Sequence, residues 1–439
     1  MIDFILYGIF SFDFFRETTL SNQPWLELAR TPFALNLGIL GALLVPFLLQ
    51  SQVRRGLIQL SIGCLVVMTG LIFTGGVLAA CCAVFGFARW TSVWVRRRGA
   101  IGLPHSLSWV FVIGLYFPFY FITYKPFDGF MTWGELTLFW GLAFLVFKAI
   151  HYLHMVCKSR VDPFEQDAFT RFLLYMIHFP SFWFGPYQRF DQFDGEVDTC
   201  KQRINRANRI AGAKRIALGC AKLFFVFHVF NLLHFYKLDF YGPFADEFFA
   251  NVDEVPIWRV WLMVAYFGLR IAVFISAISD GVIGMNRMMG IRVPENSNYP
   301  LLARDMQEFW QRWHVQAGVF LREEVFFPIG GMRHRVRAFI AVFAFSGFWH
   351  FPSVSAVVVF TALQLVMMEL AVRWARFWKT HARKDDWVHA AGLRYRLHDT
   401  WLSGGVGIVL HWFVNMISVV LIHDHFFGGT TVFPRMFGF

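Results

Sequence analysis

Two histidines, His314 and His350, lie beside tryptophans within one apolar stretch of the sequence, residues 304–352. A neutral imidazole can take a proton from a hydroxyl near neutral pH, because histidine titrates between about pH 5 and 8. An ionisable side chain among apolar residues also loses hydration that a partner must replace, which makes it a candidate for function. Taken alone, His350 is equally well explained as a hydrogen-bonded structural residue.

His314 lies in the segment EFWQRWH, which has the spacing of an amphipathic helix. In a continuous helix Trp310 lies against His314, and Glu308 pairs with Arg312 four residues further on. A histidine in this place could orient a substrate or assist a second catalytic group. The alternative is an amphipathic helix with an incidental histidine, and the segment alone favours this alternative.

His350 ends the apolar run AFIAVFAFSGFWH. Ser346 and Gly347 are small, so a neighbouring helix or a substrate can approach the chain closely there. An imidazole at the end of this run could accept the proton of a bound hydroxyl. His350 is therefore our candidate for a general base.

The elements that must position these histidines are predicted to be membrane helices. Hydrophobic residues make up 57% of the 439 positions and charged residues only 16%. Lipid cannot satisfy backbone N–H and C=O groups, so these continuous apolar runs favour helices over strands. We predict an all-α, polytopic membrane protein with roughly eleven membrane segments. They are an uncleaved N-terminal segment and the runs 33–50, 56–74, 76–90, 103–124, 130–150, 211–235, 257–284, 338–350, 354–374 and 404–423.

Two regions break the pattern of straight spans. Residues 165–193 are apolar but interrupted by two prolines and a glycine, which favours a broken or re-entrant helix. Residues 300–331 mix aromatic and charged side chains, which suits a helix buried in protein or lining a wet cavity. Because the polar connections are too short to fold separately, we predict one membrane domain.

The net charge of +11 is carried mainly by arginines and lysines in the predicted loops. By the positive-inside rule most of these loops face the cytoplasm. A basic surface attracts the headgroups of anionic membrane lipids, and it could equally bind an acidic soluble protein. We expect no nucleic-acid partner.

Other chemistries lack a complete motif. The six cysteines have no CxxC spacing and are expected to be small apolar side chains. His151 and His154, or His423 and His425, could ligate a metal ion, but neither pair has a complete ligand set, and we predict no metal site. A phosphate-binding glycine loop and a GxSxG serine motif are both absent from the sequence.

Four segments in order resemble the membrane-bound O-acyltransferase (MBOAT) superfamily: ISDGVIGMNRMMGIRVPENSNYP, MQEFWQRWHVQAGVFL, FFPIGG and SGFWH. By motif the resemblance covers residues 140–352, and the flanking spans agree in character. The segment RFLLYMIHFPSFWFGPYQRF is most similar to members that transfer D-alanine and, more distantly, to members that O-acetylate alginate.

The resemblance implies one acyltransferase domain over residues 1–439, with helices around a central funnel or tunnel. His350 matches the superfamily's catalytic histidine, and His314 matches its second conserved histidine. The chain departs from the superfamily pattern after His350, at Phe351 and Pro352, on the expected acceptor side. Candidates to line the tunnel are Trp310, Trp313, Ser346, Trp349, Asp280 and Asn296.

The leading hypothesis is a multi-pass enzyme of the inner or plasma membrane that transfers an acyl group, such as D-alanyl or acetyl, from a thioester to a hydroxyl. The donor is expected to be an acyl carrier protein or acyl-CoA, acting as co-substrate with no bound cofactor. An acidic carrier protein on the cytoplasmic face is a candidate partner, and the acceptor is an envelope polysaccharide, a teichoic acid or a glycolipid. The alternatives are a transporter or flippase without acyl chemistry, and a scaffold that only recruits the carrier protein.

Overall fold

The structure is a computed structural model, and it describes residues 39, 41–99, 102–123, 133–182, 186–235, 256–350, 354–384, 408–409 and 412–413. These residues form helices and connections without strands, which confirms the predicted all-α class for this part of the chain. The chain divides into two compact units, Met1–Phe227 with Ile275–Glu295 and His228–Phe274 with Asn296–Phe439. The single domain stays a prediction.

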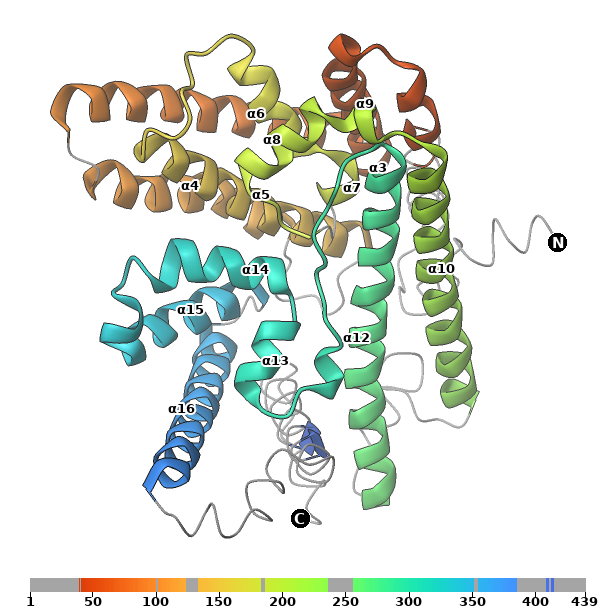
Figure 1. Cartoon of the computed structure of the whole chain (residues 1–439), viewed down its shortest axis with the longest axis vertical. Coiled ribbons are helices and arrows are strands. Elements are labelled where there is room, and N and C mark those ends of the chain that lie inside the picture. The colour runs from red at the N-terminus through yellow and green to blue at the C-terminus, as the bar shows by residue number, and fades with distance from the viewer. Residues whose placement is uncertain are drawn as a thin grey trace. The chain divides into compact units, whose positions relative to one another are not determined.

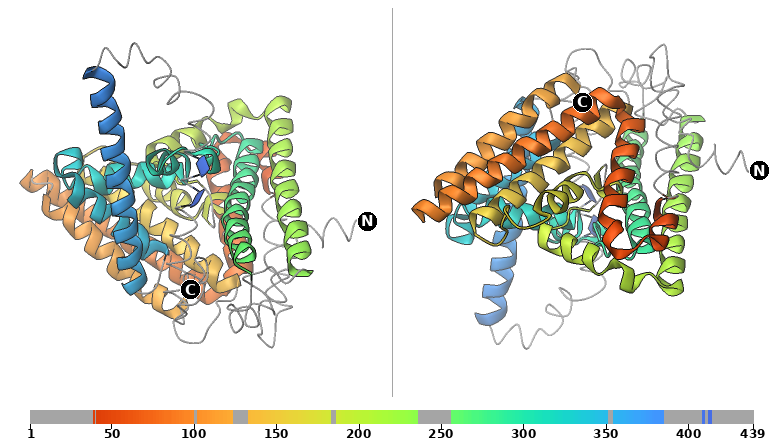
Figure 2. Two further views of the ribbon diagram at one scale, coloured as in Figure 1. Left: turned by 90° about the horizontal axis from the view of Figure 1, so that it is seen from below. Right: turned by 90° about the horizontal axis from the view of Figure 1, so that it is seen from above.

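Three long helices form the body of the first unit. They are α3 (Gln50–Arg98), α4 (Gly102–Thr123) and α5 (Trp133–Cys157), which lie side by side (Figures 1 and 2). The backbone of α3 is interrupted at Gly70, where φ is 81° and ψ is 170°. This break lies inside the predicted span 56–74, before the predicted boundary with the span 76–90. Among the described residues, Gly70–Arg98 is the one helix long and apolar enough to cross a membrane, with a mean hydropathy of 2.2. The predicted number of membrane segments stays a prediction.

Shorter elements complete the first unit: η2 (Val45–Phe47), α6 (Ala168–Ile177), α7 (Phe179–Phe182), α8 (Phe190–Asp198) and α9 (Cys200–Arg203). The predicted break in residues 165–193 is present, because α6 ends before His178 and Pro180 lies in the single turn of α7. The buried carboxylate of Asp194 on α8 pairs with Arg54 of α3 at 2.7 Å and with Arg171 of α6 at 2.5 Å. This pair of cations joins three helices around one anion.

The first unit also contains a close contact between α10 (Arg206–Phe235) and α12 (Ile257–Met288). A Cβ atom on Gly212 would lie 2.6 Å from the carbonyl oxygen of Gly284, and a Cβ on Gly219 would lie 2.6 Å from that of Ala277. Small residues allow two helix backbones to approach this closely. Figure 1 shows the two helices running alongside each other.

Both predicted catalytic histidines lie in the chain segment that forms the second unit. Its elements are η4 (Pro300–Leu302), α13 (Met306–Arg312), α14 (Val315–Phe320), the π-helical turn η5 (Leu321–Phe326), η6 (Gly331–His334), α15 (Arg335–His350) and α16 (Val354–Lys384). The prediction of one helix over residues 300–331 was wrong, because the chain divides there into short helical pieces. Helices α13 and α15 both pack on α16, around a core of Met306, Phe343, Phe360 and Met368.

Several predicted elements lie wholly or largely outside the described residues. They include the N-terminal segment and most of the predicted span 404–423. The predicted span 33–50 is described at residues 39 and 41–50, where the turn η2 and the extended backbone at Leu48 and Leu49 interrupt it, so the prediction of one straight span there was wrong. The predicted runs 338–350 and 354–374 are found in α15 and α16, although α16 continues for ten further residues to Lys384.

Candidate functional site

His314 lies at the junction of α13 and α14, in a left-handed backbone conformation with φ 44° and ψ 48°. Asp305 caps the start of α13 by accepting a hydrogen bond of 2.8 Å from the Glu308 N–H. Glu308 also pairs with Arg312 at 2.5 Å, as predicted, and the helix then ends at an extended Trp313. A residue other than glycine in the left-handed region costs about 1–3 kcal/mol, so neighbouring contacts must hold this junction.

Those contacts come from the segment that precedes η4. The N–H of Val315 donates to the carbonyl oxygen of Asn296 at 2.9 Å, and the N–H of Asn298 donates to that of Arg312 at 2.8 Å. The side chain of Asn296 is buried, with its Nδ2 atom 3.4 Å from Nδ1 of His314. Two of the predicted site residues, Asn296 and His314, are therefore in contact.

The predicted packing of Trp310 against His314 was wrong, because α13 ends two residues before the histidine. Trp310 instead donates its Nε1–H to Oε1 of Gln364 on α16, at 3.1 Å. Trp313 is an aromatic neighbour of His314, with ring centroids 5.0 Å apart and ring planes at 80°. The rings of Trp310 and Trp313 both contact Phe309, with centroids 5.4 Å and 5.7 Å from it.

Ser346 is buried on α15, and Gly347 beside it faces α16. A Cβ atom on Gly347 would lie 3.0 Å from Cδ1 of Phe360 and 3.2 Å from Cγ1 of Val357. The close approach predicted at these small residues is therefore made by a helix of the same unit. A substrate near Ser346 stays a prediction.

His350 is the last residue of α15. The side chains of His350 and Trp349 lie outside the described residues, as do Phe351 and Pro352. The structure therefore fixes the helix that carries the predicted general base, and the role of the base stays a prediction.

The residues that hold α15 in place were not among the predicted site residues. Arg335, at the start of α15, forms two hydrogen bonds to Glu369 of α16, from Nε at 2.8 Å and from Nη2 at 2.7 Å. Because Gln364 of the same helix binds Trp310 of α13, α16 contacts both α15, which carries His350, and α13, which ends two residues before His314. The one sequence signal was a carboxylate inside the apolar run VMMELAV.

Asp280 lies in the first unit, on α12, and is almost fully buried. Its two oxygens pair with Arg215 and Lys222 of α10, each at 2.5 Å. Arg215 also pairs with the exposed Glu295 at 2.6 Å. These contacts make Asp280 an anchor between α10 and α12, and its predicted place in a tunnel stays a prediction.

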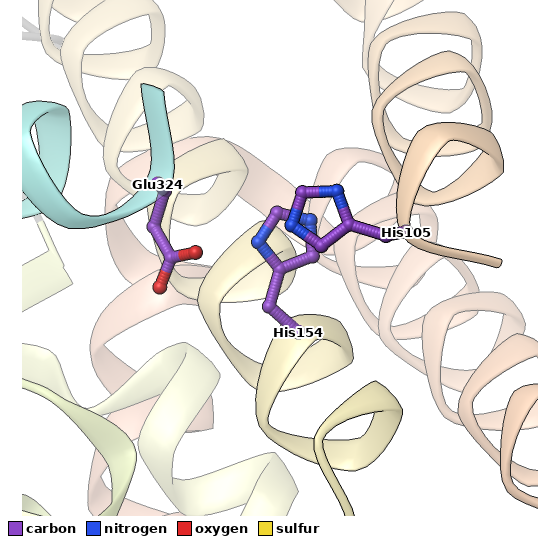
Figure 3. A group of neighbouring side chains, drawn as sticks. All are labelled: His105, His154 and Glu324. Carbon is purple, nitrogen blue, oxygen red and sulfur yellow. The ribbon is translucent and has the colours of Figure 1, made fainter. Parts of the chain in front are cut away.

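The remaining histidine candidates of the first unit are packed against aromatic rings. His154 of α5 stacks on His105 of α4, with ring centroids 3.7 Å apart and planes at 16° (Figure 3). His151 lies edge-on to Tyr187 at 5.8 Å. The two residues of the predicted His151 and His154 pair thus contact different rings. His423 and His425 lie outside the described residues.

The described elements are helices, and the length and hydropathy of Gly70–Arg98 agree with a membrane-associated protein. The model of the MBOAT, membrane-bound O-acyltransferase family matches residues 99–393, and the chain belongs to this family. It is therefore an O-acyltransferase.

Named relatives are similar to this chain over different lengths. A teichoic acid D-alanyltransferase of Streptococcus thermophilus is 25% identical over 82% of this chain and 86% of its own length. A protein named probable alginate O-acetylase, from Azotobacter vinelandii, is 28% identical over 48% of this chain and 40% of its own length. A peptidoglycan O-acetyltransferase of Helicobacter pylori is 27% identical over 43% of this chain and 34% of its own length. The chain thus matches less than half the length of the last two relatives.

Proposed function

We propose that the protein transfers an acyl group from a thioester donor on the cytoplasmic side to a hydroxyl of an extracytoplasmic envelope polymer or glycolipid. The observation that carries this proposal is the family match over residues 99–393, a range that includes both His314 and His350. Relatives named for teichoic acid, alginate and peptidoglycan support an envelope polymer as the acceptor. The acyl group is D-alanyl or acetyl, as in those names.

In the proposed step, His350 accepts the proton of the acceptor hydroxyl while the hydroxyl oxygen bonds to the thioester carbonyl carbon. The tetrahedral oxyanion is stabilised by a hydrogen bond from His314. The C–S bond then breaks, and the leaving sulfur takes the proton from His350 to give a free thiol. The ester forms without a covalent enzyme intermediate and without a bound cofactor.

The proposed architecture is a multi-pass helical protein of the inner or plasma membrane. One domain of roughly eleven membrane segments surrounds a tunnel where donor and acceptor meet. Long helices in both units and the hydropathy of Gly70–Arg98 support this arrangement. The tunnel lining is the predicted set Trp310, Trp313, Ser346, Trp349, Asp280 and Asn296.

A cationic surface of the first unit supports an anionic donor. Arg206 and Lys214 of α10 and Arg287 of α12 are exposed. The contact between Gly212 and Gly284 brings these parts of the two helices together. An acidic acyl carrier protein and acyl-CoA both complement such a surface, as do anionic membrane lipids.

The test is the envelope of cells that carry defined variants. Mass spectrometry of the envelope should show an ester that disappears on deletion of the gene and in His350→Ala cells. The matched control is His334→Ala, because His334 is an exposed histidine of the same unit. If the protein is a transporter, the ester persists in the His350→Ala cells. If it is a scaffold, the purified protein does not transfer label from a thioester donor. Either result refutes the proposal.

A further inference from the structure

The side chain of Asn296 faces one particular nitrogen of His314. The amide nitrogen Nδ2 lies 3.4 Å from ring atom Nδ1, and the asparagine is only 2% exposed. An amide nitrogen donates hydrogen bonds and does not accept them, so this orientation of the amide makes Nδ1 the acceptor. In a neutral imidazole the proton is then on the other nitrogen, Nε2.

The backbone keeps Asn296 in this position. Its carbonyl oxygen accepts from Val315, the residue directly after the histidine, and Asn298 donates to Arg312 on the other side of the junction. His314 itself is held in a left-handed conformation between two helices. Groups that are fixed in this way need little reorganisation when charge develops in a transition state.

We propose that Asn296 is a positioning residue that selects the Nε2–H tautomer of His314, so that His314 acts as a hydrogen-bond donor to the oxyanion. This inference rests on the proposed acyl transfer. It separates the two histidines by chemistry: His350 needs an unprotonated nitrogen to take a proton, whereas His314 needs a protonated one to donate a hydrogen bond.

The tautomer can be measured without any turnover. Ring-¹⁵N-labelled histidine is incorporated into the full chain in detergent, and the His314 signals are assigned by their loss in His314→Gln. At a pH where the ring is neutral, Nδ1 should resonate in the unprotonated range and Nε2 in the protonated range. The reverse pattern overturns the tautomer assignment, whether or not the protein transfers acyl groups.

The catalytic consequence is tested by Asn296→Asp. A carboxylate only accepts hydrogen bonds, so it selects the Nδ1–H tautomer and removes the donor at Nε2. Loss of one oxyanion donor lowers kcat by about 10²–10³-fold, and we expect this loss at high pH with little change in KM. At low pH the imidazolium donates from both nitrogens, so the activity of the variant relative to wild type should rise as the pH falls.

Two further variants separate this role from a structural one. Asn298→Ala is the matched control, because Asn298 is exposed and its hydrogen bonds to Arg312 are made by its backbone. It should match wild type across the pH range. Asn296→Ala leaves both tautomers accessible and should lose less activity than Asn296→Asp at high pH. If the activities of Asn296→Asp and Asn296→Ala, each relative to wild type, do not change with pH, the positioning role is overturned. Absence of acyl transfer by the wild type, with the expected NMR pattern, instead refutes the proposed function alone.

Discussion

The ion pairs of Arg215 allow a comparison between two carboxylates that share one cation. Asp280 and Glu295 both pair with Arg215, at 2.5 Å and 2.6 Å, but their side chains are 1% and 57% exposed. Lys222 is a second cation on Asp280 alone. The substitution Asp280→Asn removes the carboxylate and leaves Arg215 and Lys222 without it. Breaking a buried ion pair in this way lowers the free energy of unfolding by about 3–5 kcal/mol. Glu295→Gln breaks an exposed pair and costs about 0–1 kcal/mol.

Thermal unfolding of the two purified variants in the same detergent measures this difference. At about 2–4 °C per kcal/mol, Asp280→Asn should lower the unfolding midpoint by on the order of 10 °C, and Glu295→Gln by a few degrees at most. Equal midpoints for the two variants contradict the anchoring role.

Three further predictions concern the packing of the helices. Glu369→Gln removes a charge-assisted hydrogen bond worth about 1.5–3 kcal/mol, so it should lower the unfolding midpoint by several degrees. The double variant Arg335→Glu with Glu369→Arg exchanges the two charges and should recover part of that stability. No recovery in the exchange means that the pair itself does not fix α15. Gly284→Ala places a Cβ 2.7 Å from the carbonyl oxygen of Gly212, so it should destabilise the protein by about 1–3 kcal/mol, measured in the same melt. Gly330→Ala should cost about 1–3 kcal/mol because φ is 114° there, and an unchanged midpoint contradicts this strain.

Local patterns predicted local structure well. The i,i+4 pair of Glu308 and Arg312 is present, since both residues lie in one short helix. The break near Pro180 was visible because a proline removes a backbone donor.

The position of His314 could not be predicted in the same way. Its left-handed backbone depends on the hydrogen bond that Asn296 accepts from Val315 and the one that Asn298 donates to Arg312. Both asparagines lie outside the helical period around the histidine. The contact between Arg335 and Glu369 likewise joins residues 34 positions apart. Such pairs follow from tertiary packing, which periodicity along one segment does not encode.

The most direct test of the central claim is acyl transfer by the purified protein in proteoliposomes, with a labelled thioester donor and a hydroxyl acceptor. We predict that His350→Ala lowers kcat by at least about 10²-fold, the lower range for loss of a general base, while the unfolding midpoint stays at the wild-type value. His334→Ala should transfer the label at the wild-type rate. Transfer by His350→Ala within a few-fold of wild type contradicts the assignment of His350 as the general base.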